Sequence, residues 1–217
     1  YPISPVDVVK TILSPIFPQL TVSSTVNTIV WQIRLPRILA AILVGASLSM
    51  AGTAFQGIFK NPLVSSDLLG VSNGAGFGAA LAILLSGSSV VIQVFAFIFG
   101  IISVSITYLI SKAYKAGGIL ILVLSGVAIS AFFNSLISGI KFIADPEDKL
   151  PEIVYWLMGS LASVTMNEII MIIIPLFIGF VILYLLRWQM NILAMGDEEA
   201  QSLGLNPSRV RLIIIAA

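Results

Sequence analysis

One short segment near the carboxyl end gathers the side chains that could bind a charged partner. It reads "MGDEEAQSLGLNPSRVR" from Met195 to Arg211 and holds five of the chain's 21 charged residues, between two apolar runs. The chain has no His and no Cys, which excludes thiol catalysis, disulfides and most transition-metal sites. We therefore assign no catalytic residue, no metal and no cofactor. The segment must serve an electrostatic or mechanical contact, or be a solvated turn.

Helix start and stop signals predict that this segment bends. Asp197 is a candidate N-cap of a short helix, and the two glutamates after it place carboxylates at the positive end of the helix dipole. Gly204 suits the left-handed position that ends such a helix. Asn206 is a second N-cap, followed by Pro207 at the first position of a new helix. We call Met195–Arg211 the elbow.

A second set of small and polar residues lies inside an apolar run. Gly126, Ser130, Asn134 and Ser138 recur at every fourth position, which places them on one face of a helix. Such a stripe either lines a water-filled path or hydrogen-bonds a neighbouring helix. Both interpretations stay open, and Asn134 is the first candidate for a pathway residue.

The elements around these residues are predicted to be membrane-spanning helices. The chain is 58% hydrophobic and 10% charged, whereas a soluble domain carries about a quarter charged residues. Its apolar runs are continuous, while a β-barrel would show alternating stretches. We expect an all-α polytopic bundle. Five runs reach the roughly twenty residues that a spanning helix needs: 37–59, 68–86, 89–111, 117–140 and 167–186.

The flanking segments complete the predicted organisation. Residues 1–36 contain two amphipathic patterns, "SPVDVVKTILSP" and "STVNTIVWQI", which predict two short helices at the membrane interface. The five spans occupy 37–186. A charged coupling segment, which holds most of the elbow, occupies 187–209, and residues 210–217 begin a further span that is cut short. We expect the sequence to be a piece of a longer protein.

The spans contain no Asp, Glu, Lys, Arg or His between positions 38–59, 68–86, 88–111, 116–140 and 169–186. A proton-coupled transporter needs an ionisable relay at that depth, so proton coupling is disfavoured. No GxxxxGK[ST] loop is present to bind ATP. Energy for transport would therefore come from another subunit, although a sodium-coupled secondary carrier or a structural membrane subunit remains an alternative. The net charge of +1 without a basic tract excludes a nucleic-acid partner.

Four segments carry a resemblance to a known family. They read "WQIRLPRILAAILVGASLSMAGTAFQGIFKNPLVSSDLLGVSNGAG", "LVLSGVAIS", "LPEIVYWLMGSL" and "LAMGDEEAQSLGLNPSRVR". In this order they resemble the FecCD/BtuC-like permease subunits of binding-protein-dependent ABC importers for iron-siderophores, haem and vitamin B12. The resemblance implies a ten-helix subunit of the plasma or inner membrane, present as a homodimer. Its partners would be an ATP-binding cassette subunit, a periplasmic or lipid-anchored substrate-binding protein, a second copy and membrane lipid.

The same resemblance implies roles for particular residues. The elbow would face the cytoplasm and enter a groove on the ATPase. Arg34 and Arg37 of "RLPR" would receive carboxylates of the binding protein, although both could be snorkelling anchors. Asn73 would lie in a helix beside the pathway, and Gly117 with Gly118 near its inner constriction. The residues implied in ATPase coupling are Asp197, Glu198, Glu199, Ala200, Leu203 and Gly204.

Overall fold

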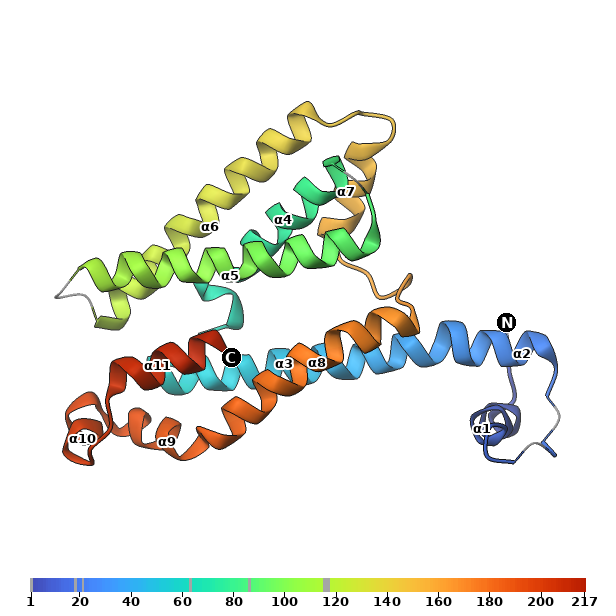
Figure 1. Cartoon of the computed structure of the whole chain (residues 1–217), viewed down its shortest axis with the longest axis horizontal. Coiled ribbons are helices and arrows are strands. Elements are labelled where there is room, and N and C mark those ends of the chain that lie inside the picture. The colour runs from blue at the N-terminus through green and yellow to red at the C-terminus, as the bar shows by residue number, and fades with distance from the viewer. Residues whose placement is uncertain (1, 18, 21, 63, 86, 115–117) are drawn as a thin grey trace. The chain divides into compact units, whose positions relative to one another are not determined.

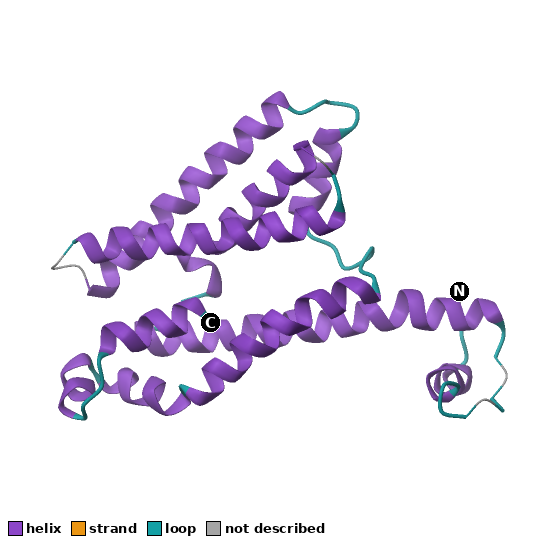
Figure 2. Cartoon of the chain, viewed as in Figure 1, coloured by secondary structure: helices purple, strands orange, loops and turns teal. Residues whose placement is uncertain are grey.

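The computed structural model describes residues 2–17, 19–20, 22–62, 64–85, 87–114 and 118–217, and every regular element within them is a helix (Figure 2). Helices suit so apolar a chain, because a helix satisfies its own backbone N–H and C=O groups where water is absent. The all-α prediction is confirmed. The chain divides into unit 1, Tyr1–Met50 with Leu161–Ile182, and unit 2, Ala51–Ser160 with Leu183–Ala217.

Unit 1 is built on the beginning of a long helix. α2 (Ser24–Thr28), the π-helical turn η1 (Ile29–Arg34) and α3 (Leu35–Phe59) follow one another and give 36 continuous helical residues (Figure 1). Pro36 lies at the second position of α3 and has no N–H to donate to the preceding turn. The wider π turn before it accommodates the proline, as such turns do inside helices. The part of α3 from Ala51 onward belongs to unit 2.

This continuity corrects one prediction about the first 36 residues. α1 (Pro5–Leu13) is a separate short helix that starts with proline after Ser4, as predicted. The segment "STVNTIVWQI", by contrast, is the first part of the long helix, because η1 lets the chain remain helical through Pro36. Trp31 Nε1 donates to the carbonyl of Thr11 at 3.1 Å and so attaches α1 to the long helix.

Unit 1 also contains most of α8 (Met166–Leu185), which stays helical around an internal proline. The flanks of α3 and α8 in this unit expose large aliphatic and aromatic side chains, such as Ile42 and Phe177. Surfaces of this kind suit contact with lipid chains.

In unit 2, three helices pack against the short apolar helix α4 (Val71–Leu85). α4 contacts α5 (Ser89–Ala113), α6 (Gly118–Ile143) and α7 (Lys149–Met158) (Figure 1). Its 15 residues are about 22 Å long, which is less than the bilayer core. The predicted run 68–86 therefore yields a helix shorter than a full span, and four described helices, not five, are long and apolar enough to cross a membrane.

Small residues bring α4 and α5 together. A Cβ atom added to Gly74 would lie 2.6 Å from the carbonyl oxygen of Phe99, and one added to Gly78 would lie 2.3 Å from that of Phe95. No side chain fits at either position without moving the backbone of α5. Gly74 and Gly78 are four positions apart and form a GxxxG pair, a spacing of small residues that lets two helices pack closely.

The turn before α4 explains why that helix starts late. Residues Ser66–Leu69 form a 3₁₀ turn, η2, and Gly70 follows with a left-handed φ of 78°. Two buried hydroxyls of α5 complete the hydrogen bonding of this turn: Ser103 donates to the carbonyl of Gly70 at 2.8 Å, and Thr107 to that of Leu69 at 3.1 Å. Irregular backbone in an apolar bundle persists where protein groups satisfy it in this way.

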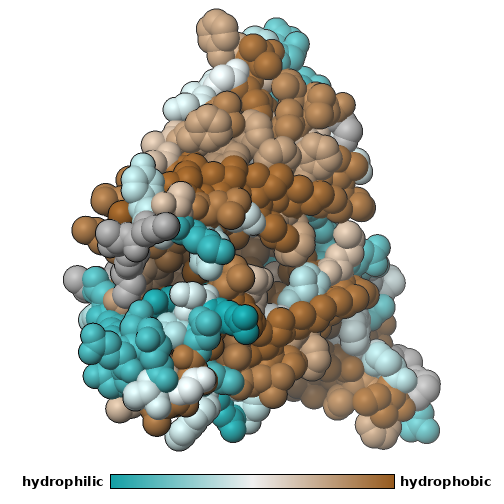
Figure 3. Space-filling view, turned by 60° about the vertical axis from the view of Figure 1, so that its left-hand side comes forward, coloured by the Kyte–Doolittle hydropathy of each residue, from teal (hydrophilic) through white to brown (hydrophobic). Residues whose placement is uncertain are grey.

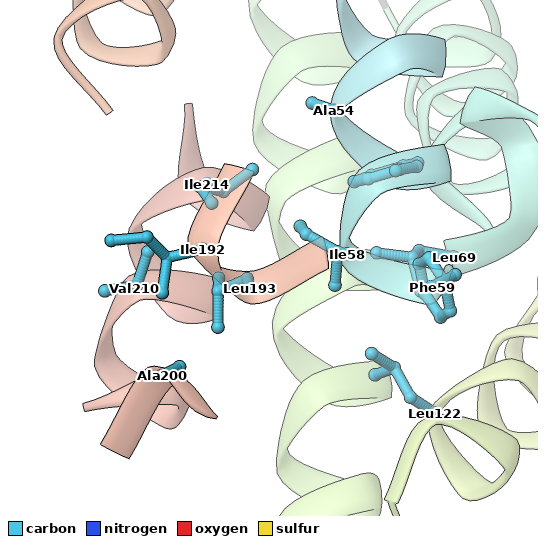
Figure 4. Packing of buried hydrophobic residues seen from close by; sticks show 11 residues of the cluster. Ala54, Ile58, Phe59, Leu69, Leu122, Ile192, Leu193, Ala200, Val210 and Ile214 are labelled. Carbon is cyan, nitrogen blue, oxygen red and sulfur yellow. The ribbon is translucent and has the colours of Figure 1, made fainter. Parts of the chain in front are cut away.

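The carboxyl end of unit 2 contributes α9 (Arg187–Met195), α10 (Asp197–Ser202) and α11 (Pro207–Ala216). Their apolar sides join one buried cluster with the end of α3, η2 and α6 (Figure 4). Its labelled members are Ala54, Ile58, Phe59, Leu69, Leu122, Ile192, Leu193, Ala200, Val210 and Ile214.

Candidate functional site

The elbow, Met195–Arg211, contains α10, the turns that connect α10 to α9 and α11, and the first residues of α11. At its far end Gly204 has φ 81°, Gly204 N–H bonds the carbonyl of Gln201 at 2.9 Å, and Leu205 N–H bonds that of Ala200 at 2.9 Å. This pair of bonds is a Schellman motif, which ends a helix in a defined geometry. Asn206 then accepts a hydrogen bond from the N–H of Arg209 at 3.1 Å and caps α11. The predicted stop and restart are confirmed.

The beginning of α10 differs from the prediction. Gly196, not Asp197, occupies the N-cap position, and Asp197 is the first residue of the helix. The carboxylate of Glu199 folds over the glycine, so that a Cβ at position 196 would lie 1.8 Å from its Oε2 atom. That carboxylate is the end of a flexible side chain and could move aside, so the backbone, with φ 159° and ψ 161° at Gly196, is what favours glycine at the N-cap.

Asp197 instead forms an ion pair with the next helix. Its two carboxylate oxygens accept hydrogen bonds from Arg211, at 2.9 Å from Nη1 to Oδ2 and 2.5 Å from Nη2 to Oδ1. A paired contact of this type fixes orientation as well as distance. This pair was not predicted from the sequence. A sequence signal for the pair exists: Arg211 lies one helical turn after Pro207, on the helix that follows α10.

The outer surface of the elbow is charged but includes an apolar side chain. Hydrophilic side chains gather at the end of the molecule that carries α10 (Figure 3). Glu198, Glu199 and Gly204 are exposed, and so is Leu203, with 61% of its surface accessible. Ala200 is fully buried in the apolar cluster, so its side chain holds α10 in place. A hollow of about 410 Å³ adjoins the charged surface and is lined by Lys60, Met195, Gly196, Asp197, Glu198, Glu199 and Arg211.

The two arginines predicted to receive carboxylates lie in unit 1, at the junction of η1 and α3. Both side chains are exposed. Arg37 Nη2 donates a hydrogen bond to the backbone carbonyl of Ala162, in the segment that precedes α8. A guanidinium has five N–H donors, so this bond holds the side chain in position and leaves other donors for a further acceptor.

The polar stripe of α6 divides into a packed half and an exposed half. Gly126 is buried against η2: a Cβ added at Gly126 would lie 2.1 Å from the carbonyl oxygen of Leu68. Ser130 also lies close to this turn, because a Cβ added at Gly70 would lie 2.9 Å from the Ser130 Oγ atom. Asn134 and Ser138 are exposed, and the Ser138 hydroxyl donates to the backbone carbonyl of Asn134 at 3.0 Å.

Asn73, the remaining predicted pathway residue, is half-buried in the first turn of α4. Gly117 lies outside the described residues, and Gly118 is the first residue of α6. Across the described ranges, no group of three His, Cys, Asp or Glu side chains is placed to hold a metal ion.

Four long apolar helices and a short charged elbow define a multi-pass membrane protein. All 217 residues match the FecCD transport family, and the chain belongs to that family. It is 36% identical over 196 residues, 90% of this chain, to the molybdate import system permease protein MolB of Haemophilus influenzae. It is 43% identical over 192 residues, 88% of this chain, to the "Probable iron chelatin transport system permease protein" of Helicobacter pylori strain 26695.

The fold has a counterpart among solved structures. An ABC transporter assigned to the metal-chelate type, in an inward-facing conformation, matches with a TM-score of 0.81 and 33% sequence identity over 97% of this chain and 70% of the other. The chain spans 58% of the length of each of the two relatives named above.

Proposed function

We propose that this chain is part of the permease subunit of a binding-protein-dependent ABC importer that carries an iron-siderophore, haem or cobalamin-type chelate across the plasma or inner membrane. The observation that carries the proposal is the elbow: a short helix with exposed carboxylates and an exposed leucine, held by a Schellman turn and an ion pair. A rigid projection of this kind suits insertion into a groove on an ATPase subunit. The permease itself would hold no catalytic residue.

Energy would reach the permease through the elbow. The permease has no Asp, Glu, Lys, Arg or His between positions 38–59, 68–86, 88–111, 116–140 and 169–186. Neither a proton relay of these residues nor the movement of their charges within the spans would therefore supply the driving force. ATP binding at two partner subunits would push the elbows, and two permease copies would rock about their shared axis. The contact residues would be Glu198, Glu199, Leu203 and Gly204, with Asp197 and Ala200 holding α10 beneath them.

The substrate-binding protein would dock on the opposite side of the membrane. Arg34 and Arg37 are exposed at the start of α3, and guanidinium groups bind carboxylates through two parallel hydrogen bonds. The bond from Arg37 to the Ala162 carbonyl supports this role, because it presents the side chain in one orientation. Two acidic side chains of a loaded binding protein are the expected counterparts.

The translocation pathway would involve the exposed part of the polar stripe. Asn134 and Ser138 present an amide and a hydroxyl that the packing of this chain leaves accessible. Gly126 and Ser130 would act indirectly, by holding η2 beside α6. Asn73 lies in the first turn of α4, the helix that follows η2.

Molybdate is a second candidate cargo. It is favoured by the 36% identity with the molybdate permease, which extends over 90% of this chain. The two relatives named above differ in the ligand of their names, so the cargo must be tested directly.

The test is reconstitution of the full-length permease with its ATPase subunit in vesicles. We expect co-purification of the two subunits, ATP hydrolysis that rises with loaded binding protein, and uptake of a ferric siderophore, haem or cobalamin. Uptake of molybdate alone would replace the cargo assignment. Uptake that follows a sodium gradient without ATP would refute the proposal in favour of a secondary carrier, and the absence of any uptake would favour a structural subunit.

A further inference from the structure

We infer that the ion pair between Asp197 and Arg211 is the positioning element that makes α10 and α11 move as one body. The inference rests on the proposed role of the elbow in ATPase coupling, and it assigns a function to two residues that do not themselves have to touch the partner. Their carboxylate and guanidinium would act through the orientation of α10.

The connections of α10 show where a second restraint is needed. At its carboxyl end the chain is fixed by the two Schellman hydrogen bonds and by the Asn206 cap of α11. At its amino end Gly196 has no side chain that could pack. The buried Ala200 fixes the middle of α10 in the apolar cluster, so the amino end is the part of α10 that a further contact would restrain. The Asp197 carboxylate, on the first residue of α10, accepts hydrogen bonds from Arg211 on α11, 14 positions later, and so ties the amino end of α10 to α11.

The geometry of the pair suits a restraint better than an ordinary surface ion pair does. Both terminal nitrogens of the guanidinium are engaged, and the Arg211 side chain is only 16% exposed, against 46% for Asp197. Arg211 Nε is buried and has no hydrogen-bond partner within the described part of the chain. The contact with Asp197 therefore accounts for all hydrogen bonds of this side chain that the structure records, and its loss would leave a largely buried cation unpaired.

The neighbouring charges do not substitute for Asp197. The Glu199 carboxylate lies over Gly196, and Glu198 is exposed. Lys60 lines the same hollow and is a cation, so it cannot pair with Arg211. The restraint thus depends on one carboxylate and one guanidinium.

A restrained α10 transmits force to a defined place. Beneath it, Ala200 shares the buried cluster with Val210 and Ile214 of α11. A force that the ATPase subunit applies to the exposed Leu203 or Glu198 would then move α10 and α11 together. Without the restraint, α10 would rotate relative to α11, and less of that force would reach α11. The expected defect is loss of coupling between ATP hydrolysis and uptake, rather than loss of hydrolysis.

The experiment uses the full-length permease in complex with its ATPase, and compares Arg211→Gln with Arg209→Gln. Arg209 lies two residues earlier on α11 and is exposed, so the second variant is a matched control. We expect substrate moved per ATP hydrolysed to fall by about 2- to 30-fold in Arg211→Gln, with the control unchanged. Asp197→Asn should show the same defect. The conservative variant Arg211→Lys keeps the charge but loses the planar guanidinium that makes two parallel hydrogen bonds, so the amount of substrate moved per ATP should be intermediate.

A second measurement tests the restraint itself. Spin labels at the exposed positions Ser202 and Leu212 report the distance between α10 and α11. We expect a narrow distance distribution in the wild type and in Arg209→Gln, and a broader one in Arg211→Gln and Asp197→Asn. Should Asp197→Asn fail to assemble, because it leaves the largely buried Arg211 cation without its partner, Arg211→Gln carries the test, since the Asp197 carboxylate that it leaves is about half exposed.

The outcomes separate this inference from the proposed function. A narrow distribution in both ion-pair variants, or a broad one with unchanged uptake per ATP, would overturn the positioning role while the importer assignment stands. A wild-type complex without ATP-driven uptake would refute the importer assignment, and the spin-label distances would still decide whether the pair restrains α10.

Discussion

The contact between Gly126 and η2 allows one stability prediction to be worked out in detail. Replacing Gly126 with alanine places a Cβ 2.1 Å from the Leu68 carbonyl oxygen and 3.1 Å from the Leu69 Cα. Both neighbours are backbone atoms, so no rotamer change relieves the clash. Ordinary contact begins near 3.4 Å, and η2 must therefore withdraw from α6 by about 1.3 Å.

That displacement carries a predictable cost. The hydrogen bonds from Ser103 and Thr107 to η2 are 2.8 and 3.1 Å long, and neither survives a shift of that size. Interhelical hydrogen bonds in membrane proteins contribute about 0.6 kcal/mol on average and up to about 1.7 kcal/mol. Overpacking adds about 1–3 kcal/mol, and the better helix propensity of alanine offsets about 1 kcal/mol. We expect Gly126→Ala to lower the free energy of unfolding by about 2–3 kcal/mol.

The measurement is reversible unfolding of the full-length protein in mixed micelles, with Gly139→Ala as the control. Gly139 lies on the same helix, and a Cβ there meets nothing within 4 Å, so this variant should equal or exceed the wild type in stability. If Gly126→Ala were as stable as Gly139→Ala, η2 would not pack on α6 as described, and the reasoning would be wrong.

Three further predictions concern the elbow, the outer surface and the pathway. Gly204→Ala must adopt a left-handed φ and should lower stability by about 1–2 kcal/mol, whereas Gly45→Ala, in open helical surroundings, should not; thermal unfolding in detergent compares the two. Replacing both Arg34 and Arg37 with glutamate should abolish capture of loaded binding protein in a pull-down, and unchanged affinity would refute the docking role. Asn134→Leu should reduce uptake severalfold in vesicles without changing ATP hydrolysis, and normal uptake would remove this residue from the pathway.

The parts of the fold that follow from local rules could be predicted from the sequence. Gly204, Asn206 and Pro207 specify the end of one helix and the start of the next through their own backbone preferences, and the structure has both where predicted. Gly74 and Gly78 likewise specify a close helix approach, because only the absence of a side chain permits it. In each case the information lies within a few residues.

The parts that depend on distant residues could not be predicted. η2 delays the start of the helix predicted over 68–86, and it persists because Ser103 and Thr107, on another helix, donate hydrogen bonds to the carbonyls of Gly70 and Leu69. Nothing in the segment itself signals that. Asp197 was expected to cap its own helix, which is the common local use of an aspartate, but Arg211 offers two hydrogen bonds instead. The π turn before Pro36 similarly replaced an expected helix boundary.

Hydroxyl groups and charged groups have different roles in this structure. In the apolar helices, Ser and Thr side chains stabilise irregular backbone, because a hydroxyl is far cheaper to bury than a charge. Two ion pairs lie outside the long apolar helices, Lys149 with Glu152 in α7 and Asp197 with Arg211 at the elbow. The second lies where, under the proposed function, a restraint must resist an applied load. A transporter driven from outside the membrane needs just this arrangement: its spans can be rearranged without moving a buried charge, and the rigid charged element lies where force is applied. The ion pair at the elbow and the hydroxyl contacts at η2 should therefore respond differently to mutation. Arg211→Gln, which removes the largely buried cation, should alter coupling more than stability. Loss of the η2 contacts should alter stability first.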